Sequence, residues 1–225
     1  MLKQLTSLLL RSIFPDRCVG CGRPGNLLCA HCCQQLQPYP GDQTQPMRSL
    51  DGTGVAYLFA EPLQSAIHRL KYEGEQRMGV ILGDLLARYW QQQPLPADAL
   101  LAVPLHPQRL AERGFNQSTL LARQLELASG LPLLDDSCLV RERETSQQAK
   151  LNARERQINV EGAFAWNHPM PPPARILLID DVMTTGATLS ACADVLRAAG
   201  CGEVRAIALG RSLARDRDSD SGTAG

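Results

Sequence analysis

The chain has 225 residues, with 23 Lys and Arg against 23 Asp and Glu, so its formal net charge is zero. Its 44% hydrophobic and 20% charged residues are close to the globular average, which excludes wholesale disorder, a collagen-like chain and a coiled coil. Because general nucleic-acid binders carry a basic excess, the balanced charge argues against that class, and any phosphate site has to be local.

The N-terminal segment predicts a short helix. Residues 1–16 show helical spacing of the apolar side chains Leu2, Leu5, Leu9 and Phe14. This helix lies either on the body of the protein or on a membrane surface. The segment has no secretory cleavage site and no apolar run of membrane-spanning length follows it, so we predict no transmembrane segment. A cytoplasmic location is expected, with a position peripheral to the inner membrane as the alternative.

The next segment holds five of the eight cysteines, between Cys18 and Cys33. Two C-x2-C pairs are separated by seven residues, and four thiolates in this pattern suit a tetrahedral structural zinc site formed by Cys18, Cys21, Cys29 and Cys32. Disulfides are the alternative, which a reducing compartment disfavours. Cys33 or His31 could replace Cys32, although the C-x2-C spacing selects Cys32.

Composition divides the chain into four parts. Residues 1–40 hold the N-terminal helix and the cysteine module, and residues 41–53 read as a linker rich in Pro, Gly and Gln. Residues 54–210 form the main domain. Residues 211–225 lack a core-forming pattern and are predicted to be a disordered tail.

Within the main domain, short apolar runs alternate with segments of helical period. Strands are expected at 54–60, 99–103, 175–180 and 203–209, and helices at 63–70, 78–93, 120–129 and 189–199. Strand, helix and strand in this order predict an α/β fold with a parallel sheet.

The segment after the strand at 99–103 carries Arg109 and Arg113 beside Asn116 and Gln117. Strands of a parallel sheet end at the same edge, so these arginines are expected near any ligand bound there and could clamp a pyrophosphate group. For Arg109, a solvated arginine at a helix start is an equally good interpretation. For Arg113, the compact RGFNQ cluster favours a functional role.

Residues 141–164 are polar and highly charged, with arginines at 141, 143, 154 and 156. A long loop is predicted. It could close as a lid over an anionic ligand, or it could be only a solvated face.

The segment from Ile176 to Leu189, ILLIDDVMTTGATL, is the most informative one. An apolar strand delivers Asp180 and Asp181 to its carboxyl end, and the small, hydroxyl-bearing residues Met183–Thr188 follow before a helix. Backbone N–H groups in such a turn, with the helix dipole, form an anion site, and the carboxylates then suit sugar hydroxyls. The alternative is that the acids only cap the helix. The chain has neither a P-loop nor a G-x-G-x-x-G turn.

This segment resembles the binding signature of type I phosphoribosyltransferases. The resemblance implies that Asp180 and Asp181 hold the ribose hydroxyls of phosphoribosyl pyrophosphate, with Mg²⁺ bound largely by the ligand's own oxygens. It implies catalytic roles for Asp180, Asp181 and Arg113. The implied substrate-binding residues are Asp180, Asp181, Val182, Met183, Thr184, Thr185, Gly186, Ala187, Thr188 and Arg109.

Four motifs together resemble the competence protein ComF / GntX family. They are RGFNQ, the run from Arg141 through Thr145 and Gln148 to Leu151, the run of Arg156, Asn159 and Gly162–Phe164, and DDVMTTGAT. The resemblance implies a type I phosphoribosyltransferase-like domain behind a zinc module, and a role in natural transformation and DNA uptake. It implies single-stranded DNA and a competence helicase or translocation machinery as partners. A non-catalytic ligand sensor or DNA-handling accessory protein is the alternative, and the acceptor substrate stays unidentified.

Overall fold

The computed structural model describes residues 15–41, 47–143, 160 and 162–212. The elements, in chain order, are α2 (Ala30–Gln34), β1 (Gly52–Leu58), α3 (Leu63–Tyr72), α4 (Arg77–Gln92), β2 (Ala99–Ala102), α5 (Pro107–Arg113), α6 (Gln117–Ser129), β3 (Leu139–Arg141), β4 (Phe164–Trp166), β5 (Arg175–Met183), α8 (Ala187–Ala198) and β6 (Glu203–Arg211). The alternation of strands and helices confirms the α/β fold predicted from the sequence.

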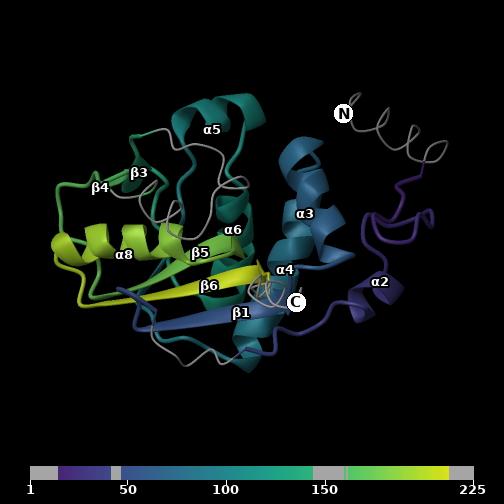
Figure 1. Cartoon of the computed structure of the whole chain (residues 1–225), viewed down its shortest axis with the longest axis horizontal. Helices are drawn as coiled ribbons and strands as arrows, with labels where there is room; N and C mark the ends of the chain where they lie inside the picture. The colour runs from purple at the N-terminus through teal and green to yellow at the C-terminus, as the bar shows by residue number, and fades with distance from the viewer. Residues whose placement is uncertain (1–14, 42–46, 144–159, 161, 213–225) are drawn as a thin grey trace, which may run out of the picture.

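A parallel four-stranded sheet, in the order β1-β6-β5-β2, forms the centre of the molecule (Figure 1). Side chains along β5 alternate between its two faces. Leu177 and Ile179 belong to one core, Ile176 and Leu178 belong to the other, and all four are fully buried. Burial on both faces is the reason that the strand reads as a continuous apolar run.

Helices cover both faces of this sheet. On one face, α4 contacts β1 and β6, and α6 contacts β2 and β5. On the other face, α8 contacts β6 and β4, and β4 pairs with β3 in a small antiparallel sheet (Figure 1). All four parallel strands therefore present their carboxyl ends at one edge, between the two helical layers.

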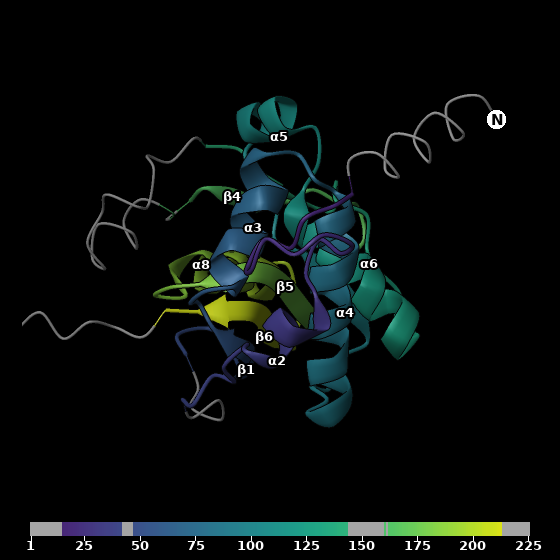
Figure 2. The same cartoon turned by 90° about the vertical axis from the view of Figure 1, so that its right-hand side faces the viewer.

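The cysteine module packs beside α3 and α4 (Figure 2). Leu27, Leu28 and Leu36 of the module share one core with Ile67 and Leu70 of α3. The module is thus in direct apolar contact with the sheet domain. The predicted linker, residues 41–53, overlaps the sheet, because β1 begins at Gly52.

Two local differences from the sequence predictions concern the ends of segments. The predicted loop 141–164 begins and ends in the antiparallel pair of β3 and β4, which local pattern did not reveal. The strand expected at 203–209 continues to Arg211, one residue into the predicted tail.

The predicted N-terminal helix, most of the predicted loop and most of the tail lie outside the described residues. Among the described residues, no helix is both long enough and apolar enough to cross a membrane.

Candidate functional site

Two neighbouring carboxylates lie near the carboxyl end of the central strand β5. The strand continues through Asp180 and Asp181 and ends only at Met183, which is 1% exposed. Val182 and Met183 are therefore strand residues, whereas the sequence placed Met183 at the start of the phosphate loop. Both carboxylates contact the amino end of α6, Asp181 through Gln117 and Asp180 through Ser118.

Asp181 is held by side chains from two helices. Its Oδ2 forms an ion pair with Nζ of Lys71 on α3, and its Oδ1 accepts a hydrogen bond of 3.3 Å from Nε2 of Gln117 on α6. Asp181 is 3% exposed. Burial favours the protonated acid, but the adjacent Lys71 ammonium outweighs it and lowers the pKa of Asp181.

Asp180 is held differently. Its Oδ1 accepts hydrogen bonds from the hydroxyl of Ser118 at 3.1 Å and from the backbone N–H of Asp181 at 2.9 Å. Burial and the charge of Asp181 raise the pKa of Asp180 to about 7. One carboxylate of the pair is thus neutralised by a lysine, while the other is costly to ionise and would gain from a cation or from ligand hydroxyls.

The phosphate loop expected after the strand is a short turn, residues 184–186, that leads directly into α8. Gly186 is the N-cap of this helix and has φ 78°, a left-handed conformation that favours glycine. The hydroxyl of Thr185 accepts a 3.4 Å hydrogen bond from the N–H of Ala187. The positive end of the helix dipole suits an anion at this point.

A cavity of about 140 Å³ joins these groups. It is lined by every residue that the sequence assigned to substrate binding, namely Asp180, Asp181, Val182, Met183, Thr184, Thr185, Gly186, Ala187, Thr188 and Arg109. Lys71, Gln117, Leu189 and Arg141 also line it, together with Val103, Pro104 and Leu105. Three basic side chains from α3, α5 and β3 therefore meet the strand's two carboxylates and the amino end of α8.

The RGFNQ cluster builds the turn between α5 and α6. Gly114 closes α5 with φ 78°. Asn116 caps α6 by accepting from the N–H of Ser118 at 3.0 Å, and its Nδ2 donates to the carbonyl of Val103 at 3.1 Å. Arg113 donates to Oε1 of Gln117, which in turn donates to Asp181. The cluster thus fixes α6 to the end of β2 and supports Asp181 through an amide.

The two arginines of this segment occupy different places. Arg109 lines the cavity, whereas Arg113 lies over the ring of Tyr72, with its Cζ 5.8 Å from the ring centroid. Arg109 therefore shares a cavity with the carboxylates. Arg113 lies outside that lining, but it bonds Gln117 and its charge interacts with Asp181.

The cysteine cluster has the composition of a closed metal site. The ligand atoms of Cys18, Cys21, Cys29 and Cys32 lie within 4.8 Å of one another. Cys18 and Cys32 are buried and Cys21 is exposed. Although burial opposes ionisation, backbone N–H groups lower the pKa of Cys18 to about 6, which favours its thiolate. Four converging thiols could hold a metal ion such as zinc, with a structural role since no ligand position is left vacant.

Comparison with known proteins places these features in one family. The phosphoribosyl transferase domain family matches residues 110–223. Competence protein F of Haemophilus influenzae is 32% identical over 208 residues, covering 87% of this chain and 90% of that protein. The chain belongs to the competence protein ComF family. DNA utilization protein YhgH of Escherichia coli K12 is 33% identical to this ComF-family chain over 205 residues, covering 87% and 84% of the two proteins.

A likeness to a solved structure is weaker. The crystal structure of purine phosphoribosyltransferase from Pyrococcus horikoshii Ot3 aligns at a TM-score of 0.32 and 15% sequence identity. The alignment covers 60% of this chain and 76% of that one.

Two basic residues of the ComF-family cavity reach it from distant parts of the sequence. Lys71 was missed by sequence reasoning, because it lies in the last turn of an ordinary amphipathic helix with no motif around it. Arg141 was assigned to the predicted lid, but it lies on β3, over the ring of Phe164 at 5.4 Å. The remaining motif residues of that segment, Thr145, Gln148, Leu151, Arg156 and Asn159, lie outside the described residues.

Proposed function

We propose that this protein binds phosphoribosyl pyrophosphate with Mg²⁺ in the cavity at the end of β5 and transfers its phosphoribosyl group. The observation that carries the proposal is the joint placement of the carboxylate pair and the amino end of α8 around one cavity with three basic side chains. A ligand that carries both a diol and phosphates matches this combination of groups.

In this proposal the chain's own groups have separate roles. Asp180 and Asp181 accept hydrogen bonds from the ribose hydroxyls, and residues 184–188 hold the 5′-phosphate at the amino end of α8. Arg109 and Arg141 stabilise charge that develops on the departing pyrophosphate. Lys71 keeps Asp181 ionised, and Arg113 orients Gln117 against the same carboxylate.

Magnesium fits this site because the ionisation of Asp180 is costly in its absence. A divalent cation near the pair would offset the desolvation and like-charge repulsion that raise the pKa of Asp180. Mg²⁺ keeps most of its ligands as water and phosphate oxygens, so the two carboxylates are sufficient protein ligands. When bound, it would supply charge neutralisation for the pyrophosphate.

Calorimetric titration of phosphoribosyl pyrophosphate with Mg²⁺ tests the proposal. The double substitution of Asp180 and Asp181 to alanine should abolish binding, because it removes both diol acceptors. Asp84→Ala is the matched control, since Asp84 is an exposed carboxylate on α4. Undiminished affinity in the double variant, or no binding by the unaltered protein, would contradict the proposal.

A second candidate function is the handling of single-stranded DNA, which the names of the relatives, competence protein F and DNA utilization protein YhgH, favour. A cytoplasmic location belongs to this proposal as well, because a four-thiolate site requires reduced cysteines. In a gel-shift titration, direct binding should weaken steeply as salt rises from 50 to about 200 mM. Binding that does not depend on salt would count against a backbone-reading site.

A further inference from the structure

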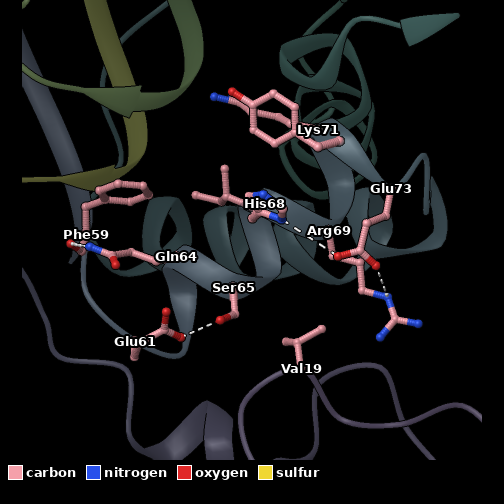
Figure 3. Close-up of a pocket in the computed structure, with 11 residues that line it drawn as sticks. Val19, Phe59, Glu61, Gln64, Ser65, His68, Arg69, Lys71 and Glu73 are labelled. Carbon is pink, nitrogen blue, oxygen red and sulfur yellow. Dashed lines mark hydrogen bonds and ion pairs between the residues drawn. The ribbon is translucent and has the colours of Figure 1, made fainter. Parts of the chain in front are cut away.

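Helix α3 connects the cysteine module to the carboxylate pair of β5. Lys71, in the last turn of the helix, forms the ion pair with Asp181, and its side chain is 20% exposed. A cavity of about 650 Å³ borders the outer side of α3 (Figure 3). Val19 lines it from the side of the module, and Ser65 and Arg69 line it from the helix (Figure 3). The contacts that hold α3 beside this open space also hold Lys71 against its carboxylate.

The first link between the module and α3 is apolar. Ile67 is 2% exposed and shares one core with Leu28 of the module and with Cys32, one of the four clustered cysteines. Residues four apart are neighbours on the surface of a helix, so Ile67 lies next to Lys71. The side chain that shares a core with the module is therefore adjacent to the one that pairs with Asp181.

The second link is a close approach at the start of α3. Gly20 lies between Cys18 and Cys21 in the first C-x2-C pair. A Cβ atom at Gly20 would lie 2.8 Å from Sγ of Cys32 and 2.8 Å from Cβ of Pro62, the N-cap of α3. Both distances are too short for a side chain, so glycine is required here. The turn that carries two cysteines of the cluster is thus packed against a third cysteine and against the helix.

The third link holds the end of α3 that carries Lys71. Nη1 of Arg69 donates a hydrogen bond of 3.3 Å to the backbone carbonyl of Arg17. Arg77, the first residue of α4, donates two hydrogen bonds to the carboxylate of Asp16, at 2.8 and 2.9 Å. Residues 16 and 17 come directly before the first cysteine of the cluster, so these bonds attach this end of the helix to the metal-binding turn.

The sheet holds α3 at its other end. A Cβ atom at Gly210 of β6 would lie 3.0 Å from Cδ2 of Leu63, the first residue of α3. Leu63 and Lys71 are about 12 Å apart along the helix axis, at 1.5 Å per residue. Packing against β6 therefore fixes the start of α3, whereas the bonds to residues 16 and 17 fix the end that carries Lys71.

These links depend on a module that a metal ion would organise. The described part of the module, residues 15–41, is short, and chains below about 40 residues usually need a metal or disulfides to fold. The four sulfur atoms lie within 4.8 Å of one another, so their thiolates repel one another unless a cation neutralises them. Loss of the metal should therefore loosen residues 16–20 and their contacts with α3 and α4.

We infer that the cysteine module is a metal-dependent positioning device for Lys71, with Arg69 as a positioning residue, and that metal in the module strengthens ligand binding at the end of β5. The second part rests on the proposed function, and the first does not. Lys71 lines the cavity at the end of β5, so its displacement removes a positive charge from a phosphate ligand there. Because linkage is reciprocal, such a ligand also raises the affinity of the cysteine cluster for its metal by the same factor.

Acetylation of Lys71 by acetic anhydride, followed by mass spectrometry of the full chain, tests the first part. Zinc-loaded samples are compared with samples treated with a chelator that prefers zinc to magnesium, and the chain unfolded in urea gives the upper limit. Chelation should raise the labelling rate of Lys71 at least about fivefold, because the ion pair with Asp181 opens. An unchanged rate would overturn the inference.

Alkylation of Cys192 in the same samples separates positioning from loss of the whole fold. Cys192 lies on α8, is fully buried and belongs to the core on the sheet face opposite to the module. It should stay unreactive towards iodoacetamide after chelation, while Lys71 becomes reactive. If chelation exposed both residues equally, the metal would support only global stability, and the inference would fail.

A substitution outside the cysteine cluster tests the link at Arg69. Arg69→Ala removes the bond to the Arg17 carbonyl and leaves every cysteine in place. It should keep one zinc per chain and raise the labelling rate of Lys71 about threefold. Arg123→Ala, at an exposed arginine of α6, is the matched control and should leave the rate unchanged. Equal rates in the two variants would overturn the role of Arg69.

Calorimetry on the same samples tests the second part. Phosphoribosyl pyrophosphate with Mg²⁺ should bind the zinc-loaded chain at least about fivefold more tightly than the chelated chain. Equal affinities, with Lys71 released in the chelated sample, would overturn the coupling. Absence of binding in both samples would contradict the proposed function instead, and the labelling of Lys71 would still decide the first part.

Discussion

Amide substitutions at the two neighbouring carboxylates of β5 should change stability in opposite directions. Burial and the charge of Asp181 raise the pKa of Asp180 to about 7, whereas Lys71 lowers the pKa of Asp181 despite its burial. Each group is replaced by an amide of nearly the same shape, so packing is preserved and charge is the main change.

The sign and size for Asp180 follow from proton linkage. The folded protein holds this proton more tightly than the unfolded chain, whose ordinary aspartate pKa is near 3.8. Protonated Asp180 therefore stabilises the folded state fully only below about pH 3.8, and this contribution is lost as the pH rises to about 7. Above pH 7, the free energy of unfolding has fallen by about 4 kcal/mol. Since the Oδ1 of an amide still accepts from Ser118, Asp180→Asn should be about 2–4 kcal/mol more stable than the unaltered protein at pH 8, and equally stable near pH 4.

The expectation for Asp181 is the reverse. Its pKa is lowered, so its stabilising effect is present at pH 8 and is lost only as the pH falls below the ordinary aspartate value. Asp181→Asn leaves the Lys71 ammonium without its carboxylate in a largely buried place, and breaking such a pair costs about 3 kcal/mol. This variant should be less stable at pH 8.

Urea unfolding followed by circular dichroism at pH 4, 6 and 8, without phosphate or Mg²⁺, measures both effects. The reasoning would be refuted if both variants were destabilised at pH 8. It would equally be refuted if the gain in Asp180→Asn did not grow as the pH rises from 4 to 8. The expected result would identify Asp180 as a group whose cost of ionisation a bound ligand offsets.

Other predictions concern the metal, the arginines and the turn. Cys29→Ser should lose the one zinc per chain that metal analysis is expected to find, while Cys33→Ser keeps it, because Cys33 lies outside the cluster. Arg109→Ala should weaken phosphoribosyl pyrophosphate binding in calorimetry more than Arg113→Ala does, since only Arg109 lines the cavity; the opposite order would contradict this placement. Gly186→Ala should lower stability in urea unfolding by about 1 kcal/mol or more, because φ is 78° there, and an unchanged midpoint would count against it.

Local signals predicted the parts of the site that are close in sequence. The turn at residues 184–186 and the two C-x2-C pairs each lie within a short stretch, where spacing and residue type fix the backbone geometry. The strand's continuation from Asp181 to Met183 was missed, because charged residues interrupt an apolar run and so hide its extension.

Other features depend on contacts between distant segments. The pairing of β3 with β4 joins segments of three residues each, too short to show a pattern of their own. The partnership of Arg113 with Gln117 and Tyr72 depends on how α3, α5 and α6 meet, so the sequence predicted a functional role for Arg113 without its partners.

By itself, the sequence determined the α/β class, the turn before α8 and the four-cysteine cluster, because each follows from local periodicity or spacing. Only the tertiary structure decided which charges meet. Lys71 reaches Asp181 because α3 packs over the end of a parallel sheet, and the cysteine module lies against α3 because it shares a core with that helix. Charge interactions act through space at a few ångströms, so the identity of their partners is fixed by packing and not by position along the chain.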